Sequence, residues 1–252
     1  MTVEVSVSKK KIDLEYGIFG EGKPVVFIHG GGTDYHYHQI FIDELCQFYK
    51  VYAFSYPGFG KSSNMKNYTL NNYLELINQF LNKMDLNLVC LVGHSMGAGL
   101  AAAYTSIHSN QVDSLILLSP FLYSYKKNIF ALANDLSKEG IIEKDYIPAY
   151  KNINNSKLSL ILSKINKLSK ILSLFKLYLF LKNTDISRYL NFTIPTIGVV
   201  GEKDLILNPD NQLDGLNKIK NIKILKYSSY GHNVLFIRKQ EIVSEIREIY
   251  KP

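Results

Sequence analysis

The sequence contains little cysteine and no apolar run at its N-terminus. The first shortage argues against a cysteine-based metal site, and the second argues against an exported protein. Cys46 and Cys90 stand far apart, fall in an expected helix and an expected buried strand, and lack the paired spacing of a metal site. We therefore expect reduced thiols in the core. The first residues alternate apolar and polar side chains without a run of signal-peptide type, so we expect a cytoplasmic protein.

Concentrated positive charge is also missing. Lysine and arginine number 29 against 22 aspartates and glutamates, a formal net charge of +7, but the lysines are spread along the chain without a compact basic block. Because nucleic-acid binding uses clustered basic residues, we expect no nucleic-acid partner. A hydrophobic fraction of 46% excludes disorder, and 252 residues suffice for one large core, in a monomer or a homodimer.

Short apolar runs alternate with helical patterns along most of the chain. Residues 2–8 and 10–19 alternate apolar and polar side chains, which predicts an antiparallel hairpin. Later runs lack strict alternation and predict strands covered on both faces, at 24–29, 51–56, 88–93, 113–119, 196–201 and 222–227. Helices are expected near 38–49, 69–84, 96–109, 210–218 and 238–250. This order predicts an α/β fold with a mostly parallel central sheet flanked by helices.

Residues 121–192 interrupt this rhythm because they contain no convincing strand and are too many for a crossover loop. We expect an insertion between two parts of a core, 1–120 and 193–252. Its centre, 156–182, places apolar side chains with helical spacing, at 158, 161, 162, 165, 168, 172, 175 and 179. The spacing favours a helical cap over the mouth of a site, and weak contact of this cap with a membrane surface is an added possibility for the same basic segment.

A serine between glycines stands where an apolar strand ends and a helix begins. The stretch "LVGHSMGAGLAAAY", residues 91–104, matches the nucleophile elbow G-x-S-x-G in its strand–turn–helix setting. Such a turn exposes Ser95 Oγ and crowds its neighbours, which accounts for the missing side chains at Gly93 and Gly97. A tight turn that only happens to contain serine has the same pattern, so the prediction depends on partners elsewhere in the chain.

Those partners are present beyond the later strands. His232 follows the last predicted strand and is the only histidine after His108, so it is the predicted base. Asp204 ends a short glycine-led turn after the strand 196–201 and is the predicted acid that orients the imidazole, with Glu202 as its nearest rival.

Two backbone N–H groups are the expected oxyanion donors. Met96 follows the nucleophile directly, and Gly31 lies in the glycine-rich loop "HGGG", 29–32, after the first long buried strand. The loop neighbours of these groups are expected to line the substrate site: His29, Gly30, Gly32, His94 and Phe121.

Two other patterns are weaker. Gly60, Lys61 and Ser62 could end a phosphate-binding loop, but the required first glycine is absent and no helix begins at once. His36 and His38 are not expected to have a carboxylate or cysteine partner, so packing or pocket-lining roles are favoured over a metal site.

The chain resembles the α/β-hydrolase superfamily, specifically single-domain members with a helical cap after the sixth strand. The resemblance rests on "FIHGGG", "SYPGFGKS", "LVGHSMGAG", "VVGEKD" and "YGH", which stand in the family's order and span nearly the whole chain. The order Ser95, Asp204, His232 is also that of the family's triad. Ser55, where many members have Asp, and Ala98, where a third glycine is common, depart from the pattern outside the triad.

The resemblance and the triad predict a carboxylesterase-like serine hydrolase that cleaves an ester or a related acyl compound through an acyl-enzyme, with no cofactor and no metal. The leucine-rich and isoleucine-rich insertion favours a small-molecule substrate with an apolar acyl or aromatic group.

The same triad serves C–C bond hydrolases, thioesterases, acyltransferases and perhydrolases, and these reactions stay open as alternatives. A ligand receptor with slow turnover is the alternative from another class. The serine argues against epoxide hydrolases and haloalkane dehalogenases, which resemble this chain but carry Asp at the elbow.

Overall fold

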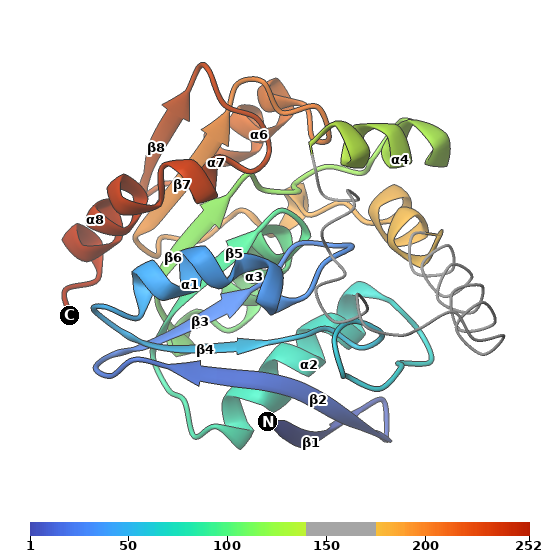
Figure 1. Cartoon of the computed structure of the whole chain (residues 1–252), viewed down its shortest axis with the longest axis vertical. Helices are drawn as coiled ribbons and strands as arrows, with labels where there is room; N and C mark the ends of the chain where they lie inside the picture. Colours follow the sequence, from blue (N-terminus) through green and yellow to red (C-terminus); the bar gives the residue numbers. More distant parts are fainter. Residues whose placement is uncertain (140–174) are drawn as a thin grey trace, which may run out of the picture.

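One eight-stranded sheet forms the centre of the molecule (Figure 1). The computed structural model describes residues 1–139 and 175–252. The strands lie in the order β1-β2-β4-β3-β5-β6-β7-β8, with β1 antiparallel to β2, β2 antiparallel to β4, and the remaining neighbours parallel. The predicted N-terminal hairpin and the mostly parallel sheet are therefore confirmed.

The elements lie close to the predicted ranges. The strands are β1 (Thr2–Val7), β2 (Lys10–Phe19), β3 (Pro24–Ile28), β4 (Lys50–Phe54), β5 (Val89–His94), β6 (Val112–Leu118), β7 (Thr196–Gly201) and β8 (Ile222–Tyr227). The α-helices are α1 (Gln39–Leu45), α2 (Leu70–Lys83), α3 (Met96–Ile107), α4 (Ile129–Lys138), α6 (Pro209–Leu216), α7 (Val234–Ile237) and α8 (Lys239–Ile249). Short 3-10 turns are η1 (Tyr35–His38), η2 (Ser109–Gln111) and η4 (Ser187–Tyr189).

Helices cover both faces of the sheet (Figure 1). Side chains from α2 and α3 pack into the core on one face, and side chains from α1, α7 and α8 pack into the core on the other. Successive residues of β3 alternate between these two cores, with Val26 on the first and Phe27 on the second. Burial on both faces explains why the predicted strands lack a polar alternation.

The predicted insertion is described only in part. Its described residues contain α4, a helical segment at 175–183 and η4, and no strand. Most of the predicted amphipathic helix, including its apolar positions from 158 to 172, lies outside the described residues. At the two remaining positions of that stripe, Phe175 is 47% and Leu179 is 39% exposed, so neither side chain belongs to the core. The segment carries apolar side chains on more than one face, and the core buries Leu177 and Phe180.

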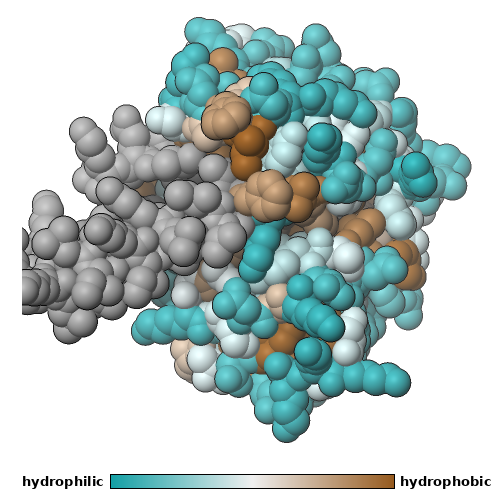
Figure 2. All heavy atoms as spheres, turned by 90° about the vertical axis from the view of Figure 1, so that its right-hand side faces the viewer, coloured by the Kyte–Doolittle hydropathy of each residue, from teal (hydrophilic) through white to brown (hydrophobic). Residues whose placement is uncertain are grey.

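The face that carries α4 and the segment 175–183 shows hydrophobic residues in small patches among hydrophilic ones (Figure 2). Phe130 of α4 is the most exposed large hydrophobic side chain of the described residues, at 82%. Across residues 1–139 and 175–252, no helix has both the length and the apolar character needed to cross a membrane.

The parallel strands bring distant loops to one edge of the sheet. Ile28 pairs with Gly93, and Gly93 pairs with Leu117, so β3, β5 and β6 end side by side. Strands β7 and β8 continue the parallel order. The loops that follow β3, β5, β7 and β8 carry all the predicted catalytic and oxyanion residues, and they meet at this edge.

Candidate active site

Ser95 forms the turn between β5 and α3. Its backbone angles are φ 55° and ψ −117°, a left-handed conformation that costs a non-glycine residue energy. The turn is held because Ser95 N–H donates to the carbonyl of Leu118 at 2.8 Å, and the carbonyl of Ser95 accepts from Phe121 N–H at 3.0 Å. The side chain of Ser95 is half-buried, whereas that of Met96 is buried.

The glycines on either side of Ser95 are required by close backbone contacts. A Cβ atom on Gly93 would lie 2.5 Å from the carbonyl oxygen of Gly97, and one on Gly97 would lie 2.2 Å from that of Ile28. Both contacts are far inside van der Waals distance, and both involve backbone atoms that cannot turn away. The local sequence of the elbow therefore follows from how closely α3 approaches β3 and β5.

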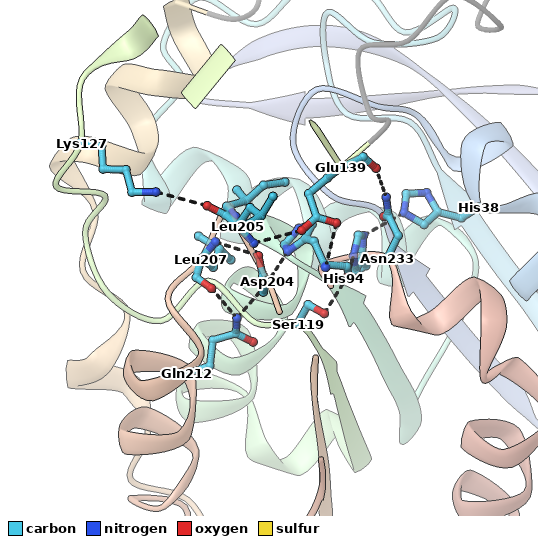
Figure 3. Close-up of polar contacts among 12 residues, drawn as sticks. His38, His94, Ser119, Lys127, Glu139, Asp204, Leu205, Leu207, Gln212 and Asn233 are labelled. Carbon is cyan, nitrogen blue, oxygen red and sulfur yellow. Dashed lines mark hydrogen bonds and ion pairs between the residues drawn. The ribbon is translucent and has the colours of Figure 1, made fainter. Parts of the chain in front are cut away.

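Asp204, labelled in Figure 3, forms a buried, hydrogen-bonded pair with His232. Nδ1 of His232 lies 2.7 Å from Oδ2 of Asp204, and the side chains are 1% and 0% exposed. The other carboxylate oxygen of Asp204 accepts from the N–H groups of Ile206 and Leu207, each at 2.9 Å. Gln212 of α6 donates to Asp204 Oδ2 at 2.8 Å. These bonds fix the carboxylate in the position from which it can orient the imidazole.

The structure places Ser95 beside this pair without joining it to His232. The imidazole of His94, the residue before Ser95, lies with its ring centroid 4.9 Å from that of His232. The described residues show no hydrogen bond between Ser95 Oγ and His232. Such a bond is often long in an enzyme without substrate and shortens in the reacting complex.

The predicted oxyanion loop follows β3 and lies against the elbow. A Cβ atom on Gly30 would lie 3.2 Å from Cβ of Ser95, and one on Gly31 would lie 2.3 Å from Cδ1 of Leu177. Leu177, from the segment 175–183, therefore packs directly on Gly31. Met96 is the first residue of α3, where a backbone N–H has no partner within the helix and is available to an anion.

Three buried histidines support the loops around Ser95. Tyr56 N–H donates to Nε2 of His29 at 2.9 Å, which leaves the proton on Nδ1 for the carbonyl of Gly30 at 2.7 Å. Nε2 of His38 lies 3.0 Å from Nδ1 of His94, whose Nε2 lies 3.3 Å from the carbonyl oxygen of His232. Both ring nitrogens of His29 and of His94 are thus engaged by the protein.

Burial keeps these imidazoles neutral. It lowers the pKa of His29 to about 4 and that of His38 to about 3, and it lowers the pKa of His94 well below its ordinary value. The charged forms of the neighbouring histidines lower the pKa of His38 and His94 further. A neutral imidazole can bridge two loops at little desolvation cost, which suits the packing role predicted for His38.

Phe121 serves the core in this structure. Its side chain is 1% exposed and its ring centroid lies 6.4 Å from that of Phe180. A Cβ atom on Gly99 would lie 2.2 Å from the Phe121 carbonyl oxygen, so α3 approaches this loop closely. The remaining glycine of the oxyanion loop, Gly32, is exposed and adopts φ +84°.

The residues of the two weaker patterns meet at Glu15 of β2. Lys61 N–H donates to the Glu15 carboxylate at 2.9 Å, and Nε2 of His36 lies 3.2 Å from it. Burial would raise the pKa of Glu15, but the hydrogen bonds from Lys61, His36 and Ser55 outweigh it and hold that pKa below its ordinary value. A buried carboxylate therefore occupies the loop where a phosphate would have to bind. In residues 1–139 and 175–252, no group of three or more His, Cys, Asp or Glu side chains could hold a metal ion.

One site residue was not found from the sequence. Glu139, just after α4, accepts from the backbone N–H of His232 at 3.1 Å and from that of Leu205 at 3.0 Å (Figure 3). No pattern marks it, because a single glutamate at a helix end is common and its partners lie 66 and 93 residues away in the sequence.

Known proteins share this architecture. A family model described as "alpha/beta hydrolase fold" matches residues 23–174. The "Putative esterase/lipase 3" of Mycoplasma genitalium is 28% identical over 233 residues, which cover 86% of this chain and 82% of the relative. The "Abhydrolase domain-containing protein abhd-5.2" of Caenorhabditis elegans is 34% identical over 144 residues, and the match covers 50% of this chain and only 32% of that protein. A solved thermophilic esterase from Thermogutta terrifontis has a TM-score of 0.74 at 20% identity, with 100% of this chain and 98% of the esterase covered.

Proposed function

Because the chain belongs to the alpha/beta hydrolase fold family and is a hydrolase of that fold, we propose that it is a serine hydrolase acting on carboxylic esters or related acyl compounds. Ser95 Oγ attacks the carbonyl carbon, His232 takes the serine proton and returns it to the leaving group, and Asp204 holds the imidazole. The N–H groups of Gly31 and Met96 stabilise the oxyanion. Water then attacks the acyl-enzyme with His232 as base, which releases the acid and restores Ser95.

The observation that carries this proposal is the buried pair of Asp204 and His232 at the sheet edge where Ser95 forms its strained turn. A carboxylate held by three hydrogen bonds and bonded through a fourth to an imidazole is the arrangement that a serine base needs, since it fixes both the tautomer and the ring orientation. A tight turn with a chance serine has no need of such a pair.

Substrate access is proposed along a groove beside the elbow. A groove of about 670 Å³ lies between the residues before α2 and the segment 175–189. Tyr68 and Lys176 line both this groove and a smaller cavity that reaches Met96 and Leu177. Apolar side chains in the groove, Leu70, Leu179 and Phe180, suit an apolar acyl or aromatic substrate. We propose that residues 121–192 act as the cap over this path.

The proposal is tested by hydrolysis of p-nitrophenyl esters from acetate to decanoate. Turnover should disappear in Ser95→Ala and after treatment with a fluorophosphonate, which labels only an activated serine. Labelling without ester turnover would contradict the ester substrate class and favour C–C bond hydrolysis or slow-turnover ligand reception on the same serine. Absence of labelling would mean that Ser95 is not a nucleophile.

A further inference from the structure

The loops that carry Asp204 and His232 share an anchor outside the sheet. One carboxylate, that of Glu139, accepts from Leu205 N–H at 3.0 Å through Oε1 and from His232 N–H at 3.1 Å through Oε2. Leu205 follows the predicted acid directly, and His232 is the predicted base. The two oxygens therefore connect the acid loop to the base loop through a single side chain.

The contact extends beyond these two bonds. The carbonyl of Glu139 accepts from Nδ2 of Asn233 at 2.9 Å, so both neighbours on the base loop bind the same residue. On the acid loop, Lys127 Nζ donates to the carbonyl oxygen of Leu205 at 3.2 Å, and the same ammonium pairs with Asp135 of α4 at 2.8 Å. Leu205 is thus held through its N–H and its carbonyl by residues on either side of α4 (Figure 3).

Gly231 leaves room for the Glu139 carboxylate. A Cβ atom on Gly231 would lie 2.6 Å from Oε2 and 2.7 Å from Oε1 of Glu139. Any side chain at that position would displace the carboxylate, and Gly231 does not adopt a positive φ that would by itself require glycine. The missing side chain at Gly231 therefore leaves the space in which the end of the Glu139 side chain lies, immediately before the base.

We propose that Glu139 is a positioning residue that fixes the acid and base loops to each other and thereby sets the alignment of Asp204 with His232. This inference rests on the proposed function. Hydrogen bonds from backbone N–H groups to a carboxylate are stronger than neutral ones, and a small displacement of a catalytic pair costs a large factor in rate. Loss of the carboxylate should therefore lower kcat while KM changes little, because the groove residues are not in this contact.

The test compares Glu139→Ala and Glu139→Gln with Glu202→Gln, each normalised to the serine that a fluorophosphonate titrates. We expect kcat to fall about tenfold in Glu139→Ala with KM within about twofold of the wild type. Glu139→Gln keeps one acceptor oxygen and should recover part of the loss. Glu202 is exposed on the same loop as Asp204, so Glu202→Gln removes an equal charge and should leave kcat unchanged.

The rate of amide hydrogen exchange measures the same contact independently of enzyme activity. The N–H of His232 should exchange faster in Glu139→Ala than in the wild type and at the wild-type rate in Glu202→Gln. Unchanged exchange at His232, or a wild-type kcat per titrated serine in Glu139→Ala, would overturn the inference. A fall in melting temperature with full activity per titrated serine would also overturn it, because the role would then be structural only. If the wild type neither labels nor hydrolyses, the proposed function fails, while the exchange rates still decide whether Glu139 holds the loops.

Discussion

Oδ2 of Asp204 lies 2.7 Å from Nδ1 of His232 although 28 residues separate them in the sequence. Asp204 follows β7 and His232 follows β8, and these strands are neighbours in parallel register. Because the carboxylate also accepts from two backbone N–H groups and from Gln212, its charge is stabilised in a buried place. The pair is therefore built to keep a carboxylate next to an imidazole.

Replacing Asp204 by Asn should reduce kcat by about 10³-fold to 10⁴-fold, because an amide no longer holds the proton on Nδ1 of His232 and no longer stabilises the imidazolium. Initial rates on a p-nitrophenyl ester measure the change. Glu202→Gln is the matched control, since Glu202 was the rival acid in the sequence and lies exposed in the structure. A large loss in Glu202→Gln with little loss in Asp204→Asn would exchange the two roles.

Gly97→Ala should destabilise the fold by about 2 kcal/mol or more, because the new Cβ would meet the carbonyl oxygens of Ile28 and His29 at 2.2 and 2.5 Å. Urea unfolding gives the change in the free energy of unfolding. Gly215→Ala in α6 is the control, where the added Cβ meets Cδ1 of Leu122, the end of a flexible side chain, at 2.5 Å. We expect a change within about 1 kcal/mol there, and equal losses at the two glycines would contradict the packing account of the elbow.

Leu177→Ala should move the preferred acyl chain of the ester substrate to a longer one. Leu177 packs on Gly31 and lines the cavity that reaches Met96, so its truncation opens space beside the predicted oxyanion donors. The relative kcat/KM values across a series from acetate to decanoate measure the shift. Phe175→Ala shortens a side chain that is 47% exposed on the same helical segment and lines neither the groove nor the smaller cavity, so it should leave the preference unchanged. An identical chain-length profile in Leu177→Ala and the wild type would place the acyl group elsewhere.

Acid should destabilise the protein through its buried histidines. The pKa of His38 is lowered to about 3 in the folded state, whereas an unfolded histidine titrates near 6.5, so between these values the unfolded state binds more protons. The free energy of unfolding is therefore highest above about pH 6.5 and falls as the pH decreases, by about 2 kcal/mol per such histidine from pH 7 to pH 5.

Urea unfolding of the wild type and of His38→Asn at both pH values tests this linkage. Asparagine has no proton to bind in this range, so the variant should lose about 2 kcal/mol less than the wild type between pH 7 and pH 5. An equal loss in both proteins would show that His38 does not contribute to the pH dependence.

Local patterns were sufficient to predict the elbow and the strands. The period of the apolar residues distinguishes the hairpin from the strands that are covered on both faces. The glycines at 93 and 97 mark a turn in which backbone atoms leave no space for a side chain. The same reasoning did not identify the side chains that the core buries at residues 175–183, since apolar side chains stand on more than one face of that segment. It also gave no role to Glu139.

The sequence alone predicted the order of the strands and helices, the turn at Ser95, and Asp204 and His232 as its candidate partners with Glu202 as a rival acid, because each depends on side chains within a few residues of one another or on position after a strand. Only the tertiary structure decided that Leu177 packs on Gly31, that His38 meets His94, and that one carboxylate joins the loops of Leu205 and His232. These contacts join residues far apart in the chain. Their geometry follows from how the sheet, the helices and the inserted segment pack together, which no local pattern encodes.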